Sequence, residues 1–285
     1  MKRALAFLCG ACLAAAQAWA EPAVDVVRMI VIPVSNLDRS LAFYTGALSF
    51  EPTDTAELPG TTLQLGQQRI ELVGRAGRPV PKDSRSNDLW FQHLAIVVSD
   101  IDRAYAAVMR GGAVPISAGP QELPAWNPNA GGIRAVYFRD PDGHPLELIQ
   151  FPPGKGLAHW QSKDRLFLGV DHSAIAVRDT KTSLAFYRDR LGLHIAGASE
   201  NWGIEQERLS AVPGAHVRIT SLRAQAGPGI ELLHYLMRTD GRPAPADTHP
   251  KDLWSEVIVM AGRGFDRPGL TLRDPDGHAL SIEPD

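Results

Sequence analysis

Three segments of this 285-residue chain are present twice. Self-similarity of this kind indicates two copies of one structural unit, which makes equivalent positions in the two halves comparable. A ligand residue that one half keeps and the other lacks points to the half that carries the chemistry. The repeated pairs are 140–144 with 274–278, which both read Asp-Pro-Asp-Gly-His, 77–90 with 241–254, and 41–44 with 184–187, which both read Leu-Ala-Phe-Tyr.

The N-terminus has the pattern of a secretory signal. Lys2 and Arg3 precede an apolar run over residues 4–16, which is too short to span a bilayer. Ala18-Trp-Ala20 then supplies small residues at the two positions that define a cleavage site. We therefore interpret residues 1–20 as a signal peptide and expect a periplasmic or secreted protein. A retained N-terminal anchor is the alternative.

Cysteine usage and charge narrow the possible functions. Cys9 and Cys12 both lie in the expected signal, so the mature chain has no disulfide, thiolate ligand or cysteine nucleophile. Any metal site must then use histidines and carboxylates. The formal net charge is −3 and shows no basic stripe, so nucleic acid is not an expected partner. No later segment predicts a membrane span. We expect a small-molecule substrate and a monomer or homodimer.

Strand and helix patterns divide the chain into four units, each of the form β-α-β-β-β. The fourth unit is abbreviated, because residues 261–269 leave no room for a full helix. A segment rich in proline and glycine at 153–167 predicts a linker. It separates an N-terminal domain over 26–152 from a C-terminal domain over 168–285. The expected first strands lie at 26–34, 91–98, 170–177 and 255–260, and the expected last strands at 69–73, 145–151, 229–235 and 279–283.

Two motifs resemble the vicinal oxygen chelate superfamily, which includes glyoxalase I, extradiol dioxygenases, epimerases and bleomycin-resistance proteins. One is Leu-Ala-Phe-Tyr, followed in the second copy by Leu191-Gly-Leu193, and the other spans residues 137–147. The resemblance implies an α+β fold in which paired modules curl into two half-open barrels, each around one site. It does not choose a reaction, because this fold hosts several.

The resemblance also implies that metal ligands lie on the first and last strands of each module. We expect the modules of each half to pair with each other. The predicted site then uses Glu71, His93 and Glu147 to hold one divalent ion, Fe, Mn, Zn or Ni. A hydrogen-bonded lining without metal is the alternative for these residues. The aligned first-strand positions are Met29, His93, His172 and Val257, and the last-strand positions are Glu71, Glu147, Glu231 and Ser281.

By this alignment the C-terminal half has fewer residues that could bind a metal. It offers His172 and Glu231, but Val257 and Ser281 occupy the other two positions. Glu283 could substitute for Ser281, since it shares a strand face with it. The alternative is that His172 and Glu231 are a vestigial pair, and the sequence leaves this open.

Other residues lie near these positions in the sequence. Tyr137 matches a tyrosine that lies near the substrate in extradiol dioxygenases, and its hydroxyl could donate to a substrate oxygen. His144 and His278 fit turn residues of the shared fold, as do the repeated Gly-Arg-Pro loops. Trp126 and Asn127, in the long loop 121–132, could close over the N-terminal cleft.

Our hypothesis is that the protein is an exported metal-dependent enzyme. It would be a glyoxalase-like isomerase or lyase that acts on a small substrate with two neighbouring oxygens. Glu71 or Glu147 would double as its proton-transferring base. Extradiol ring cleavage is an alternative that needs two histidines and one glutamate, and Met29 stands where the second histidine belongs. A metal-free binding protein of the resistance type is the competing class. The substrate and the identity of the metal stay open.

Overall fold

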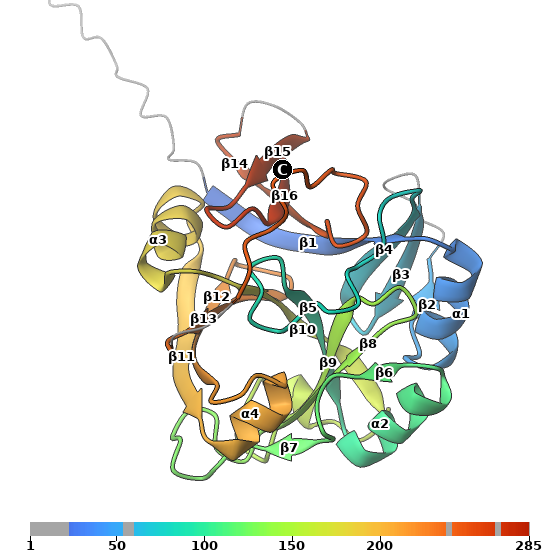
Figure 1. Cartoon of the computed structure of the whole chain (residues 1–285), viewed down its shortest axis with the longest axis vertical. Coiled ribbons are helices and arrows are strands. Elements are labelled where there is room, and N and C mark those ends of the chain that lie inside the picture. The colour runs from blue at the N-terminus through green and yellow to red at the C-terminus, as the bar shows by residue number, and fades with distance from the viewer. Residues whose placement is uncertain (1–22, 54–59, 238–240, 266–268, 285) are drawn as a thin grey trace, which may run out of the picture.

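The computed structural model describes residues 23–53, 60–237, 241–265 and 269–284 (Figure 1). The expected signal peptide, 1–20, lies outside these residues. Within the described ranges, no helix is long and apolar enough to cross a membrane.

Two mixed sheets form the protein, as expected for an α+β fold of two half-open barrels. One sheet has seven strands in the order β15-β16-β14-β1-β4-β3-β2, and the other has nine, with β11-β12-β13-β10-β5-β9-β8-β6 in line and β7 paired to β8 (Figure 1). The strands are β1 Ala23–Val34, β2 Glu51–Pro52, β3 Thr61–Leu65, β4 Gln68–Gly74, β5 Gln92–Val98, β6 Val114–Pro115, β7 Gln121–Glu122, β8 Arg134–Arg139, β9 Pro145–Gln150, β10 Phe167–Ala176, β11 His194–Trp202, β12 His216–Arg223, β13 Gly229–Tyr235, β14 Val257–Arg263, β15 Leu270–Arg273 and β16 Ala279–Pro284.

Short polar caps begin the helices of the first three modules. Asn36, Asp100 and Asp179 each accept a hydrogen bond from a backbone N–H three residues on, which satisfies a donor that the first helical turn leaves free. The described residues between β14 and β15 contain no helix, so the fourth module is abbreviated as predicted. The helices are α1 Leu37–Gly46, α2 Ile101–Arg110, α3 Thr180–Leu184 with its π-helical continuation η2 Ala185–Arg190, α4 Ile204–Ser210, which the sequence did not predict, and the 3-10 turn η1 Ala158–Gln161.

The modules pair across the two halves of the chain, and the expectation that they pair within each half is wrong. β1 of the first module lies antiparallel to β14 of the fourth, and β5 of the second lies antiparallel to β10 of the third. All four first strands are apolar enough to pair with any other. Loop-closure entropy grows only slowly with loop length, so the connecting segments permit either arrangement. The sequence pattern therefore does not decide between them.

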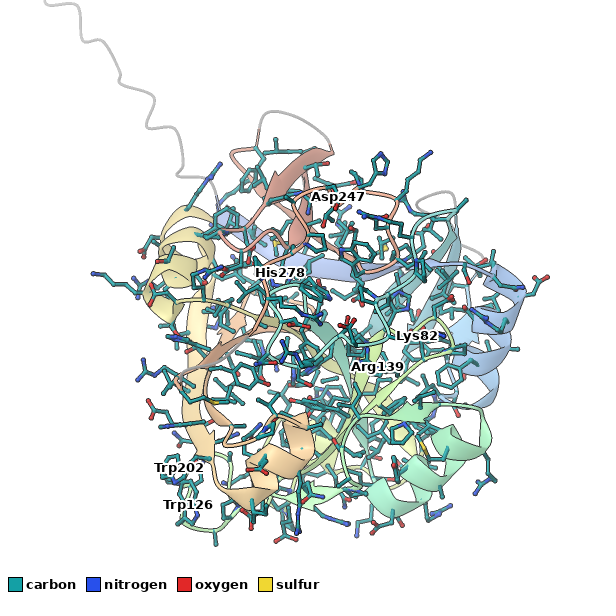
Figure 2. All side chains as sticks on the ribbon, viewed as in Figure 1. Lys82, Trp126, Arg139, Trp202, Asp247 and His278 are labelled. Atoms are coloured by element: carbon teal, nitrogen blue, oxygen red, sulfur yellow. The ribbon has the colours of Figure 1, made fainter. Side chains whose placement is uncertain are left out.

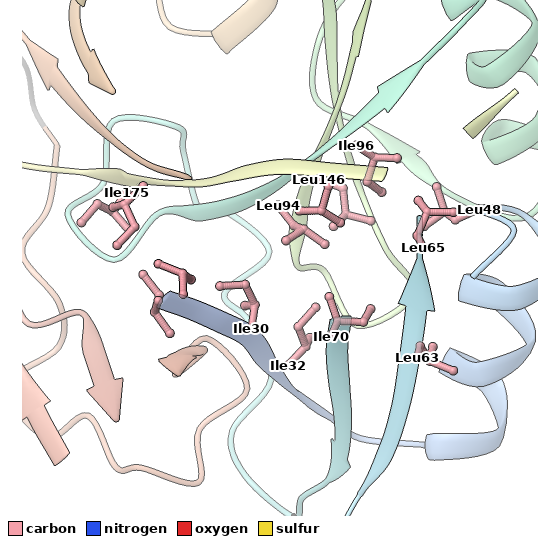
Figure 3. Close-up of a cluster of buried hydrophobic side chains, with 14 of the residues drawn as sticks. Ile30, Ile32, Leu48, Leu63, Leu65, Ile70, Leu94, Ile96, Leu146 and Ile175 are labelled. Carbon is pink, nitrogen blue, oxygen red and sulfur yellow. The ribbon is translucent and has the colours of Figure 1, made fainter. Parts of the chain in front are cut away.

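The main hydrophobic core lies between the two sheets. Ile30 and Ile32 of β1 face Leu94 and Ile96 of β5 across this core (Figure 3). Side chains alternate along a strand, so His93, next to Leu94, points to the other face of the nine-stranded sheet. Each large aliphatic side chain buried here contributes about 1.5–3 kcal/mol to stability. The packing of this core therefore determines which face carries the polar residues.

The repeated Asp-Pro-Asp-Gly-His turn connects the two modules within each half. Asp140 accepts hydrogen bonds from the hydroxyl of Tyr44, at 3.2 Å, and from the backbone N–H of His144, at 2.9 Å. In the second copy, Asp274 accepts from the hydroxyl of Tyr187, also at 3.2 Å. Both turns thus join modules within one half. His144 of the first turn also donates from Nε2 to the backbone oxygen of Leu253 in the other half, at 2.8 Å, which gives it the structural role expected of a turn residue.

Candidate metal centre

Three neighbouring strands of the nine-stranded sheet bring together two imidazoles and a carboxylate. His93 lies on β5, Glu147 on β9 and His172 on β10, and β5 is the central strand of the three. The register pairs Ala95 with Glu147 and Ala174 with His93, which places all three polar side chains on one face. The residues between them, such as Leu94 and Leu146, belong to the core on the other face.

The ligand atoms of this group converge. Nε2 of His93 is 3.0 Å from Oε2 of Glu147, and Nε2 of His172 is 3.4 Å from the same oxygen. One ligand atom from each of the three residues lies within 4.8 Å of the other two, and all three side chains are buried. Glu231 on β13 adds a second carboxylate, with its Oε2 3.4 Å from Nε2 of His172.

This arrangement fits a divalent metal ion. Among the described residues, Nε2 of His93 and Nε2 of His172 have no partner with hydrogen-bond geometry, although both are buried. Buried polar atoms without partners are costly unless something else satisfies them. Two imidazoles with one or two carboxylates suit Fe, Mn, Zn or Ni and leave coordination positions for substrate. His93, Glu147 and His172 could therefore hold such an ion, with Glu231 beside them.

The charges within the group support one another. Burial acts to raise the pKa of Glu147, but His172 and His93 outweigh it and hold this pKa at about 2. Burial acts to lower the pKa of His172, but Glu231, Asp171 and Glu147 raise it well above its ordinary value. The metal-free group therefore holds an ionised carboxylate beside a protonated imidazole. A metal ion would have to displace that proton, which makes binding pH-dependent.

The predicted grouping of Glu71 with His93 and Glu147 is not the one that the fold makes. Glu71 lies on β4 in the seven-stranded sheet, paired in register with Val31 and Thr62. The equivalent face of that sheet has an apolar cluster that includes Met29. Because the modules pair across the halves, His172 and Glu231 of the third module take the places in the group that the sequence assigned to Met29 and Glu71 of the first.

The alignment of ligand positions by the repeats was nevertheless sound. One sheet holds the four aligned positions that are all possible metal ligands, His93, Glu147, His172 and Glu231. The other sheet holds the four positions of which only the glutamate is a usual ligand, Met29, Glu71, Val257 and Ser281. The signal that could have found this grouping was the completeness of the set, since pairing across the halves yields two histidines and two glutamates in one place.

A cavity of about 550 Å³ opens beside the group. Glu147, His172 and Glu231 line it together with Tyr137, whose ring centroid lies 4.8 Å from that of His93. Burial, with Glu147 as the next cause, raises the pKa of Tyr137 well above its ordinary value, so the hydroxyl stays neutral and can donate a hydrogen bond. The rest of the wall is mostly apolar, with Leu123, Ala130, Ile133, Ala135, Ile149, Phe151, Ala198 and Ile219 among its residues.

The loop that carries Trp126 and Asn127 meets the end of β11 at the rim of this cavity. The rings of Trp126 and Trp202 stack with their centroids 4.0 Å apart and lie side by side on the surface (Figure 2). Nδ2 of Asn127 donates to Oδ1 of Asn201 at 2.7 Å, and both residues are buried. Trp126 and Asn127, which were expected to close over an N-terminal cleft, thus contact β11 of the C-terminal half, and their loop borders the cavity that both halves line.

Residues 26–148 and 169–282 match the profile of the Glyoxalase/Bleomycin resistance protein/Dioxygenase superfamily. The chain belongs to this superfamily. A virulence protein of Salmonella typhimurium is 29% identical to it over 134 residues, which are 45% of this chain and 85% of the relative. A lactoylglutathione lyase of Haemophilus influenzae is 32% identical over 131 residues, which are 42% of this chain and 88% of the relative.

Two plant relatives match over part of their length, and a solved structure shares the fold. The chain spans about half of two plant relatives, 44% of a lyase from Brassica oleracea and 54% of one from Arabidopsis thaliana. The crystal structure of glyoxalase I from Zea mays superposes with a TM-score of 0.60 at 16% identity, covering 90% of this chain and 92% of that one. At this identity the likeness concerns the fold.

Proposed function

We propose that this superfamily member is a divalent-metal enzyme, a glyoxalase-like isomerase or lyase acting on a small substrate with two neighbouring oxygens. The observation that carries the proposal is the convergence of His93, Glu147 and His172, of which Glu147 and His172 line an open cavity together with Glu231. A bound divalent ion would supply Lewis-acid stabilisation of negative charge on a substrate oxygen.

The chain's own residues divide the remaining work. A carboxylate with a pKa of about 2 is a weak base, so Glu147 serves as a ligand. Glu231 is less buried and lines the cavity, and the hydroxyl of Ser221 donates a hydrogen bond to its Oε1. It takes the proton from a substrate carbon next to a carbonyl and returns it to the neighbouring carbon. Tyr137 donates its hydroxyl proton in a hydrogen bond to a substrate oxygen.

Metal content tests the first part of this proposal. Elemental analysis of the purified protein should find one divalent ion per chain. His93→Ala and His172→Ala should each abolish it, because each removes one of three ligands. Glu71→Gln is the control and should retain the metal, since Glu71 lies in the other sheet. Loss of metal in Glu71→Gln alone, or a wild type that stays metal-free after loading, would contradict the proposal and favour a metal-free binding protein.

Ring-cleaving dioxygenation is a second candidate, and one observation favours it. The fold supplies the two histidines and one glutamate that this reaction needs, because His172 fills the position for which the sequence offered only Met29. Glu231→Gln separates the two functions. A glyoxalase-like activity, measured as lactoylglutathione formation from a 2-oxoaldehyde and glutathione, should fall strongly, whereas oxygen consumption with a catechol and Fe(II) should persist.

We also propose that residues 1–20 are removed on export. The charged start, short apolar run and small residues before Glu21 support this. Intact-mass measurement of protein from the native host should give a chain that starts at Glu21, and a mass that includes residues 1–20 would contradict export with cleavage.

A further inference from the structure

The bulge in β10 brings Asp171 next to the candidate ligand His172. The pairing register of β10 with β5 shifts between Val170 and His172, which breaks the alternation of side chains along the strand. Asp171 and His172 therefore both line the cavity, although they are consecutive. Oδ2 of Asp171 is 2.9 Å from Nδ1 of His172.

Two further residues hold Asp171 in place. The indole N–H of Trp160 donates to its Oδ1 at 3.0 Å, and Nη2 of Arg223 donates to the same oxygen at 2.7 Å. Trp160 lies on η1, within the segment predicted as a linker, and is buried. A Cβ on Gly169 would lie 2.7 Å from the Trp160 ring, so this strand needs glycine there for the indole to fit.

The other positions in the two sheets lack this arrangement. Nδ1 of His93 has no hydrogen-bond partner within the described ranges. In the seven-stranded sheet the equivalent pair is Arg28 and Met29, so the ligand and the carboxylate beside it are both replaced there. β1 and β10 are both bulged first strands. Of these two, β10 has a histidine ligand and the carboxylate next to it, and β1 has neither.

We propose that Asp171 is a positioning residue that keeps the proton of His172 on Nδ1 and turns Nε2 toward the metal. This rests on the proposed function, because it assumes that His172 is a ligand. A carboxylate that accepts from the far nitrogen of a ligand histidine fixes its tautomer and orientation, and losing it weakens metal binding by about 10–100-fold. Trp160 and Arg223 act through Asp171, which gives the linker segment a part in building the site.

The test measures the Kd for Zn²⁺ by competition with a chromophoric chelator. Asp171→Ala should weaken binding by about 100-fold and Asp171→Asn, which keeps an acceptor oxygen, by about 10-fold. Trp160→Phe keeps the ring but loses the N–H donor, and it should weaken binding less than either. The visible spectrum of the Co²⁺ form should change in the same order. If Asp171→Ala does not fold, Asp171→Asn and Trp160→Phe carry the comparison.

Asp140→Asn is the matched control, because Asp140 makes the same contact with Nδ1 of His144, at 3.0 Å, in a turn outside the group. It should lower the melting temperature and leave the Zn²⁺ Kd unchanged. Unchanged Kd values in the Asp171 variants would overturn the proposal.

Nuclear magnetic resonance of the metal-free protein separates this inference from the proposed function. A hydrogen-bonded Nδ1 proton on His172 that disappears in Asp171→Ala supports positioning even if the wild type binds no metal, in which case only the proposed function fails. Its absence from the wild type would overturn the positioning role.

Discussion

Along the strands of this site, each candidate ligand is next in sequence to side chains of the core, which point to the opposite face of the sheet. Leu146 and Leu148 pack in the core between the sheets, and Glu147 between them faces the cavity. Ile230 and Leu232 flank Glu231 in the same way. Because a slip of one residue would exchange the two faces, burial of these aliphatic side chains also holds the carboxylates in place.

At this scale, Tyr137 is the residue whose role is most open to test. Tyr137→Phe removes the hydroxyl and keeps the ring that contacts His93, so packing is little changed. If the hydroxyl stabilises charge on a substrate oxygen, kcat should fall by about 10- to 1000-fold while the metal content stays the same. Full activity in the metal-loaded variant would leave Tyr137 as a cavity-lining aromatic.

Glu256 predicts a dependence of stability on pH. It is buried, and within the described part of the chain its Oε2 has no hydrogen-bond partner. Burial raises its pKa to about 8, although His144 acts to lower it. The folded protein therefore holds a proton that the unfolded chain releases near its ordinary pKa of about 4.3. This favours folding at low pH, and the advantage is lost as the pH rises toward 8.

Melting temperatures from pH 5 to 9 measure this effect. Glu256→Gln should show a flatter profile than the wild type and should be more stable relative to it at pH 9 than at pH 5. Exposed Glu51 is the control, and Glu51→Gln should follow the wild type. Parallel profiles for Glu256→Gln and the wild type would show that Glu256 does not titrate in this way.

At the scale of elements, the repeated Gly-Arg-Pro loops, residues 77–90 and 241–254, bind each other through an arginine of each loop. Arg78 of the first copy donates to Asp252 at 2.8 Å and to Asp247 at 2.9 Å in the second copy. Arg242 of the second copy donates in the same way to Asp88 at 2.7 Å and to Asp83 at 2.6 Å in the first copy. Each guanidinium also lies over a tryptophan of the opposite loop, at 5.0 and 4.9 Å from the ring centroid. Asp88 and Asp252 are buried, so these bonds compensate buried charge.

This contact predicts a role in stability rather than in chemistry. Arg78→Ala with Arg242→Ala should lower the melting temperature clearly, because two buried carboxylates lose their main donors, and should leave the metal content unchanged. Arg188→Ala is the control, since Arg188 pairs with Asp189 on the surface and such pairs contribute little. An unchanged melting temperature in the double variant would show that the contact between the two loops does not stabilise the fold.

On the scale of the whole molecule, the two halves cannot be separated without dividing the candidate site. His93 and Glu147 come from the first half, and His172 and Glu231 from the second. The Asp-Pro-Asp-Gly-His turns connect modules within a half, while β1 with β14 and β5 with β10 connect the halves. The pairing of β5 with β10 gathers these four residues in one sheet, so the described part of the chain holds one complete ligand set.

The sequence by itself determined the local order of this protein. Repeats and strand and helix patterns depend on neighbours along the chain, so they predicted the modules and the abbreviated fourth unit. They also aligned eight positions that have equivalent places in the register of the two sheets. The superfamily follows from the same motifs.

Only the tertiary structure decided which modules meet. The choice of β10 rather than β1 as the neighbour of β5 depends on contacts between residues far apart in the chain, and four similar apolar strands offer no local signal for it. That choice put His172 and Glu231 in the candidate site in place of Met29 and Glu71. The bulge that sets Asp171 beside His172 depends on the same pairing, because a bulge exists only relative to a partner strand.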